Sequence, residues 1–396
     1  MSADLTKNPG DPAVAASSAD SATDTVANVD TARLSAETPA AVEPEPSDEG
    51  PPQSLLASLR GRQSVWIFLV LVVIVAFFAI KGGDRFASAS NFSLIAQNLA
   101  VLAVLGVGMT FVIITSGIDL SIGSVLVFSS VISAKVMAAM GGDNGTVILV
   151  GVLVAIASGA AWGFINGFLV AKAKIPPLVV TLGTLAAALG LAQVVTTGNN
   201  ISITNVNSLT DFGIYQRFLG IPALVFVALI LVIIGGIVLH RTKFGRYTYA
   251  IGSNEEAARR VGIRVERHLI GIYAVTGALA GVGAVMYLAE FSTTTIAGAT
   301  LTNLNVITAV VIGGTSIFGG LGTMFGTVVG LFIPAVLQSG LVIIGVQSYW
   351  QSVAVGLVLV AAVYVDQSRR RAALRGAKPT SRLRSRRRPS VRKEEQ

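Results

Sequence analysis

Residues 146–171 read TVILVGVLVAIASGAAWGFINGFLVA, a stretch of 26 residues without a charged side chain. A helix needs about 20 apolar residues to cross a hydrocarbon layer roughly 30 Å thick, so this stretch predicts a membrane-spanning helix. Gly159, Gly163 and Gly167 recur within it at every fourth position. Small residues at this spacing let the backbone of a second helix approach closely. The stretch therefore predicts a bundle of tightly packed helices in lipid.

Similar apolar runs extend along most of the chain, which is 53% hydrophobic and 13% charged. We expect an all-α integral membrane protein of about ten transmembrane helices. The predicted spans are 65–80, 94–115, 120–140, 146–171, 178–197, 221–239, 268–288, 303–319, 323–346 and 350–365. Further glycines four residues apart, which indicate close helix packing, are Gly277 and Gly281, and Gly322, Gly326 and Gly330.

Two polar stretches that contain glycine interrupt the apolar pattern at related places, residues 115–123 and 313–322. Both are typical of broken or re-entrant helices. Irregular backbone at membrane depth persists only where protein or a watery cavity satisfies its polar groups, so such stretches point to a translocation path. Their placement also suggests an inverted repeat that relates helices 2–5 to helices 7–10.

The chain divides into three regions by composition. Residues 1–59 hold ten acidic and two basic residues and read as a disordered extension. Residues 60–368 form the predicted transmembrane domain. Residues 369–396 form a tail with twelve bases, which we expect to lie on anionic membrane lipid. No aromatic side chains interleave its arginines, so we expect no nucleic-acid partner.

The basic residues of the short loops predict the orientation, because such loops favour the cytoplasmic side. A cytoplasmic N-terminus and an even number of spans put both termini inside a multi-pass protein of the plasma or inner membrane. The bases that this topology places inside are Lys172, Lys174, Arg241, Lys243, Arg246, Arg259, Arg260, Arg264 and Arg267, together with the tail. Only Lys81, Arg85 and Arg217 face outward.

Several kinds of chemistry are excluded by the residues that are missing. The chain has no cysteine, and its two histidines, His240 and His268, are too far apart in sequence to suggest a ligand pair for a metal. We find no G-x-x-x-x-G-K-[ST] phosphate loop. We therefore expect neither catalytic residues, nor a bound metal, nor a cofactor held by this chain.

The longest charged stretch between apolar runs, residues 240–267, predicts a short helix. Ser253 and Glu256 have the spacing of a capping box, in which the hydroxyl and the carboxylate each accept from a backbone N–H at the helix start. Ala257 and Ala258 continue the helix, and Gly262 is suited to a left-handed end. Such a helix would transmit motion from a soluble partner, although an ordinary amphipathic loop helix fits the capping signals as well.

Asp119 is the most suggestive side chain for a pathway, because an acid within a membrane helix is costly and usually functional. The predicted topology puts it at a cytoplasmic turn that solvent could hydrate. There it could instead cap the helix that follows, with Ser121 beside it. Asn166, Thr181, Thr315 and Gln338 are further candidates to line a polar path, but each could equally bond a neighbouring helix.

Three separated motifs resemble one family. Glu256, Ala257, Ala258 and Gly262 resemble the EAA loop of ATP-binding-cassette (ABC) importer permeases. The surrounding FGRYTYAIGSNE of residues 244–255 is similar to the same loop in ribose- and xylose-type permeases. Residues 108–124, GMTFVIITSGIDLSIGS, and 311–316, VIGGTS, resemble two further signatures of that family. The resemblance extends over about residues 65–368.

This resemblance implies a permease that translocates a small, ribose- or xylose-like sugar. It implies a second permease subunit, either an identical copy or a close relative, a cytosolic ABC ATPase that uses ATP and Mg²⁺, and an extracytoplasmic sugar-binding protein. Ser253, Asn254, Glu255, Glu256, Ala257, Ala258 and Gly262 would belong to the helix that couples to the ATPase. An ion- or proton-coupled secondary transporter is the alternative, since broken helices and inverted repeats also occur in that class.

Overall fold

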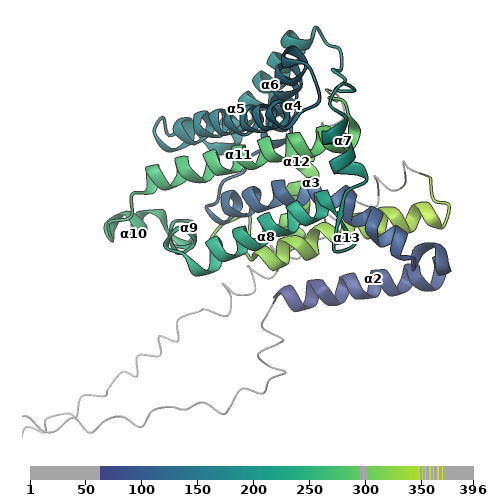
Figure 1. Cartoon of the computed structure of the whole chain (residues 1–396). Coiled ribbons are helices and arrows are strands. Elements are labelled where there is room, and N and C mark those ends of the chain that lie inside the picture. The colour runs from purple at the N-terminus through teal and green to yellow at the C-terminus, as the bar shows by residue number, and fades with distance from the viewer. Residues whose placement is uncertain are drawn as a thin grey trace, which may run out of the picture. The chain divides into compact units, whose positions relative to one another are not determined.

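A computed structural model describes residues 63–294, 296 and 302–347, together with residues 350, 353, 356, 357, 360, 364 and 368. The predicted extension 1–59, the basic tail 369–396 and most of the predicted span 350–365 lie outside these residues. In the described part, nearly every segment is helical (Figure 1).

The described residues form eight helices that are long and apolar enough to cross a membrane. They are α2 (Gln63–Phe86), α3 (Ala89–Ile114), α4 (Ile122–Met140), α5 (Gly145–Ala171), α6 (Pro177–Thr196), α8 (Ala223–Arg241), α11 (Val265–Phe291) and α13 (Met324–Ile343). Shorter elements are α7 (Asn207–Ile214), α9 (Lys243–Ser253), α10 (Glu255–Arg260), α12 (Thr302–Ile312) and the antiparallel pair β1 (Arg217–Phe218) and β2 (Ile221–Pro222). The predicted all-α membrane fold is confirmed.

Short polar side chains set several helix starts by accepting a hydrogen bond from a free backbone N–H of the first turn. Ser88 accepts from the N–H of Asn91 at 3.2 Å at the start of α3. Asn144 begins α5, and Thr323 begins α13 in the same way. Polar residues between the apolar runs therefore fix where each span begins.

Glycines bring α5 and α11 into backbone contact, as their spacing predicts. A Cβ atom at Gly159 would overlap the carbonyl oxygen of Gly277, and one at Gly277 would overlap that of Gly159. A Cβ atom at Gly163 would overlap the carbonyl oxygen of Tyr273. The two helices run side by side through the bundle (Figure 1). This contact is the most extensive between any two described helices.

The eighth predicted span, 303–319, is shorter in the structure. Helix α12 ends at Ile312, because Gly313 and Gly314 break it and Gly314 takes a positive φ of 90°. It packs against the start of α13, where a Cβ atom at Gly330 would overlap the carbonyl oxygen of Ala309. The run is therefore a short helix followed by an irregular loop, as the glycines in 313–322 indicate. The inverted repeat stays a prediction.

The bundle has two ends that differ in charge. Helices α9 and α10 lie at one end, where α3, α5 and α8 end and α11 and α13 begin, and we call it the α9–α10 end (Figure 1). Helix α7 lies at the opposite end. The nine bases that the predicted topology places inside the cell lie in or beside the segments of the α9–α10 end.

The α5–α11 contact leads to a stability prediction. We expect Gly163→Ala to lower the free energy of unfolding by about 1–3 kcal/mol, because the new methyl group overlaps backbone that cannot rotate away. Thermal melting of the detergent-solubilised protein measures the change. The control is Gly183→Ala in α6, where no atom lies within 4 Å of the added Cβ. Equal melting temperatures for the two variants would contradict the role of the glycine.

Candidate functional site

The α9–α10 segment, residues 243–260, is a pair of short helices joined by a sharp turn. Thr242 starts α9 by accepting from the N–H of Gly245 at 3.4 Å. The chain turns at Asn254, whose backbone is extended, with a φ of −162°. The side chain of Asn254 then accepts from the N–H of Ala257 at 2.9 Å and starts α10. Each helix thus has its own N-terminal cap.

The predicted capping box of Ser253 and Glu256 is wrong. Ser253 is the last residue of α9, so its hydroxyl does not start α10. Asn254 takes that place, and Glu256 bonds Arg260 at 2.5 Å instead of reaching back to the turn. The predicted left-handed end is confirmed, because Gly262 has a φ of +86° and the N–H of Ile263 bonds the carbonyl of Ala258.

Helix α10 turns Ala258 inward and most of its other side chains outward. Ala258 is 4% exposed and packs in a small cluster with Ile251 and Val265. Glu255, Glu256 and Ala257 are exposed. Ala258 therefore packs the helix against its neighbours, while Glu256, Ala257 and Arg260 remain exposed.

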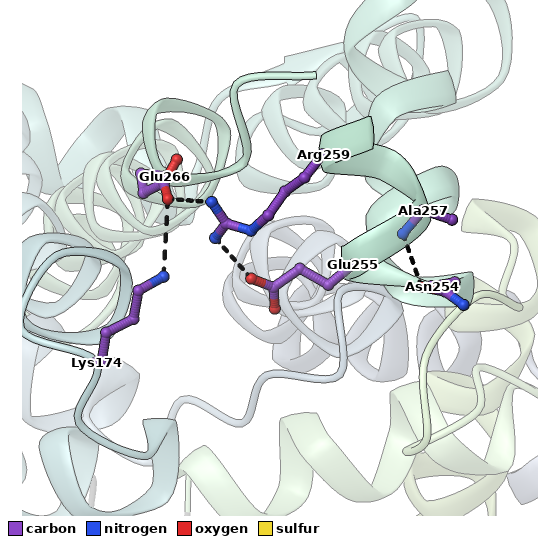
Figure 2. A network of polar contacts seen from close by, with 6 residues as sticks. All are labelled: Lys174, Asn254, Glu255, Ala257, Arg259 and Glu266. Carbon is purple, nitrogen blue, oxygen red and sulfur yellow. Dashed lines mark hydrogen bonds and ion pairs between the residues drawn. The ribbon is translucent and has the colours of Figure 1, made fainter. Parts of the chain in front are cut away.

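Ion pairs tie α10 to its neighbours (Figure 2). The Arg259 guanidinium lies between Glu255 of its own helix, at 2.8 Å, and Glu266 of α11. Lys174, which follows α5, reaches the same Glu266 carboxylate at 3.7 Å. The hydrogen bonds to Glu255 and Glu266 raise the pKa of Arg259. This network joins α10 to the start of α11 and links both to Lys174, which is far away in sequence. Sequence reasoning missed it.

Helix α9 contacts the two irregular loops that follow α3 and α12. The hydroxyl of Tyr249 donates to the carbonyl of Gly322 at 2.7 Å. A Cβ atom at Gly252 would overlap the carbonyl oxygen of Ile114, so only glycine fits there. The same Ile114 carbonyl accepts from the N–H of Gly320 at 2.8 Å. The end of α9 therefore packs closely against both loops.

The two loops also bond each other, because Ser116 donates from its hydroxyl to the carbonyl of Phe318 at 2.8 Å. Residues 115–121 and 313–323 thus meet beside the end of α9. Sequence analysis named both stretches but did not place them together. We call this contact between α9 and the two loops the loop junction.

Four predicted pathway residues gather around the first loop. Asp119 accepts from the N–H of Ser121 at 2.8 Å and from its hydroxyl at 2.6 Å. Asn166 of α5 donates to the Ser121 hydroxyl oxygen at 2.8 Å. Thr181 of α6 donates to the carbonyl of Ile118 at 3.1 Å. These side chains hold the loop to α5 and α6. This fits the alternative that such residues bond neighbouring helices instead of lining a polar path.

Asp119 differs from its prediction in one respect. The expectation that solvent hydrates it is wrong, because it is only 3% exposed. Its carboxylate instead bonds the residue just before α4, which fits the alternative role at the start of that helix.

The remaining two candidates lie apart from that group. Thr315 is buried in the second loop, and its hydroxyl has no hydrogen-bond partner among the described residues. Gln338 of α13 is exposed and lines a cavity of about 100 Å³ with Asn98, Asn305 and Thr308. Sequence analysis missed these three residues, although the amides of Asn98 and Asn305 within apolar runs were a usable signal. The described part of the chain holds no cluster of acidic or histidine residues that could bind a metal.

The ion-pair network predicts different effects for the two arginines of α10. We expect Arg259→Ala to speed amide hydrogen exchange in residues 255–262 roughly fivefold, because a partly exposed pair of this kind contributes about 1 kcal/mol or less. Arg260→Ala is the matched control, since the partner of Arg260 among the residues that the structure describes is Glu256 on the same helix. Exchange followed by mass spectrometry tests this, and equal protection in both variants would show that the link to α11 adds nothing.

Comparison with known proteins identifies the family. The model of the family described as "Branched-chain amino acid transport system / permease component" matches residues 91–363. The ribose import permease protein of Escherichia coli K12 is 35% identical over 79% of this chain and 95% of its own length. The ribose import permease protein of Bacillus subtilis is 37% identical over 78% of this chain and 94% of its own length. The fructose import permease protein of Rhizobium meliloti is 35% identical over 80% of this chain and 88% of its own length.

No solved structure matches the chain. The relatives are transport subunits and not enzymes. The family match covers more than half of the chain, and the similarity to each of these relatives covers most of both proteins. The three motifs of the loops and the α9–α10 segment therefore indicated the family correctly. The chain is a multi-pass membrane protein that belongs to the branched-chain amino acid and sugar permease family of ABC importers.

Proposed function

We propose that this chain is the membrane-spanning subunit of an ABC importer that carries a ribose- or xylose-like monosaccharide. The observation that carries the proposal is the 35–37% identity to ribose and fructose import permeases over nearly their whole length. A D-allose permease protein, 33% identical over 76% of the chain, supports the same class of substrate. All three named sugars are neutral and rich in hydroxyl groups.

The proposed partners follow from the class of transporter. A second permease subunit completes the membrane part, an external solute-binding protein delivers the sugar, and a cytosolic ATPase consumes ATP with Mg²⁺. We assign the ATPase contact to α10, where Glu256 and Arg260 have side chains that are 75% and 76% exposed. Val261 next to them is 77% exposed and adds an apolar side chain to the surface that we assign to the ATPase.

The charge of the bundle ends supports the orientation that this function needs. Lys and Arg concentrate in loops on the cytoplasmic side of membrane proteins. The basic α9–α10 end would therefore face the cytosol, where the ATPase is found. Both termini would lie on the same side, with the basic tail on the anionic lipid of that leaflet.

The loop junction suggests how ATP hydrolysis would move the transmembrane helices. Closure of the ATPase subunits would push on α10, which is anchored to α11 by Arg259. Helix α9 would pass this motion through Gly252 and Tyr249 to the loops between α3 and α4 and between α12 and α13. The four helices would then tilt together, which is the basis of alternating access.

The coupling role of α10 predicts a loss of function without a loss of stability. We expect Glu256→Lys to abolish ATPase docking and uptake, because it reverses an exposed charge on the docking surface. The fold should be nearly unaffected, since an exposed i,i+4 pair contributes roughly 0.3–0.5 kcal/mol. Co-purification of the ATPase and sugar uptake measure docking and transport. Asp84→Lys, an exposed charge reversal at the opposite end, is the control, and normal docking by Glu256→Lys would refute the role.

Dependence on the ATPase separates the proposal from a secondary transporter. Cells that lack this chain would receive it with or without its ATPase, and uptake of labelled pentoses and hexoses would be measured. We expect uptake of one or a few sugars to return only when both proteins are present. Recovery with this chain alone, and sensitivity of that uptake to a proton uncoupler, would establish the secondary transporter instead.

A further inference from the structure

A cavity between α3, α12 and α13 is lined by polar side chains, although these helices are otherwise mostly apolar. Asn98 of α3, Asn305 and Thr308 of α12, and Gln338 of α13 line it, and leucine and alanine side chains fill the spaces between them. Pro334 of α13 also lines it. Three helices that are separate in sequence thus direct uncharged polar groups to one place.

These amides lie at membrane depth. Asn98 is nine residues from the start of α3, or about 14 Å along the helix, and Gln338 is five residues from the end of α13, or about 8 Å. Helix α12, which carries Asn305, packs against both α3 and α13. A hydrocarbon layer of roughly 30 Å therefore encloses all three residues.

The three amides are exposed and have no bonding partner among the described residues. Asn98, Asn305 and Gln338 are all exposed, and none makes a side-chain hydrogen bond to another described residue. An amide that faces lipid without a hydrogen bond costs on the order of 2–7 kcal/mol. Three such groups on one face would be very costly in contact with acyl chains, so this face meets water, a ligand or a second polar surface.

The contrast with the first loop is informative. Asp119, Ser121 and Asn166 bond one another, and Thr181 bonds the carbonyl of Ile118, so those predicted pathway residues are engaged within the chain. The amides around the cavity, in contrast, make no side-chain hydrogen bond to a described residue. Pro334 adds to the difference, because a proline has no N–H and leaves the carbonyl four residues earlier without its helical partner.

We infer that Asn98, Asn305 and Gln338 line the substrate passage and hydrogen-bond a neutral, polyhydroxylated solute as it crosses. An amide both donates and accepts, as a sugar hydroxyl does, and no charged side chain of the described chain lines the cavity to attract an ion. The inference rests on the proposed function for its sugar class, and it adds the residues and helices that the solute touches. The cavity is small, about 100 Å³, which suits brief contact with the solute and not tight binding.

Water access tests the passage without knowledge of the sugar. The chain has no cysteine, so Asn98→Cys, Asn305→Cys and Gln338→Cys each introduce a single thiol. The assembled transporter, with its ATPase and binding protein in proteoliposomes, would be treated with a charged methanethiosulfonate reagent. We expect each thiol to react at least tenfold faster than the thiol of Leu153→Cys, at an exposed apolar position of α5. Reaction as slow as that of Leu153→Cys would overturn the inference.

A second experiment distinguishes substrate contact from contact between subunits. We expect Asn98→Leu, Asn305→Leu and Gln338→Leu to lower D-ribose uptake at least tenfold per ATP hydrolysed, with assembly and ATP hydrolysis retained. Gln193→Leu, which removes an exposed amide near the end of α6, is the matched control. Loss of assembly together with slow thiol reaction would show that the amides bond a second copy. Failure of the wild-type transporter to carry any pentose or hexose would refute the sugar assignment, while the thiol rates would still report on the passage.

Discussion

The structure depends on one constraint of the membrane: a helix that breaks inside the bundle must find hydrogen-bond partners for its free backbone groups within the protein. Helices α3 and α12 both end in irregular loops, and the two loops satisfy each other. The Ile114 carbonyl accepts from Gly320, and Ser116 donates to Phe318. The chain can therefore interrupt two helices only because it brings these interruptions together. That requirement also places the end of α9 against both of them.

The contacts of the α9–α10 segment with the rest of the bundle fix its position. Taken alone, α10 is a single short helix with one buried alanine, and its ion pairs are partly exposed and individually weak. Its position is fixed because it is attached on both sides, to α11 through Glu266 and to the loop junction through α9. In the proposed coupling role, a force on α10 would reach both α11 and the helices that the two loops connect. Unpaired amides occur on three of the helices next to that junction.

Much of the fold was predictable because the signals were local. The long apolar runs predict the membrane-spanning helices, the glycines at every fourth position predict close helix packing, and Gly262 predicts the end of α10. Each of these patterns lies within a short stretch of sequence. The predictions failed where two neighbouring residues could each cap the same helix, or where residues distant in sequence determine burial and hydrogen bonding. Ser253 and Asn254 are both good caps, and the extended backbone at Asn254 selected the second. Asp119 is buried beside Ser121, which bonds Asn166 of the distant helix α5, and its own segment does not reveal this. Likewise, the sequence could not separate Asn166, whose amide bonds Ser121, from Gln338, whose amide bonds no described residue.

The loop junction has a further property that follows from its atoms. Its bonds join backbone amides to carbonyls, a serine hydroxyl to a carbonyl, and the Tyr249 phenol to Gly322. Burial raises the pKa of Tyr249 to about 12, so the phenol keeps its proton in any cellular compartment. The close fit at Gly252 involves no side chain at all. These bonds between α9 and the two loops therefore depend little on pH or on salt concentration, whereas the Arg259 ion pairs weaken as ionic strength rises.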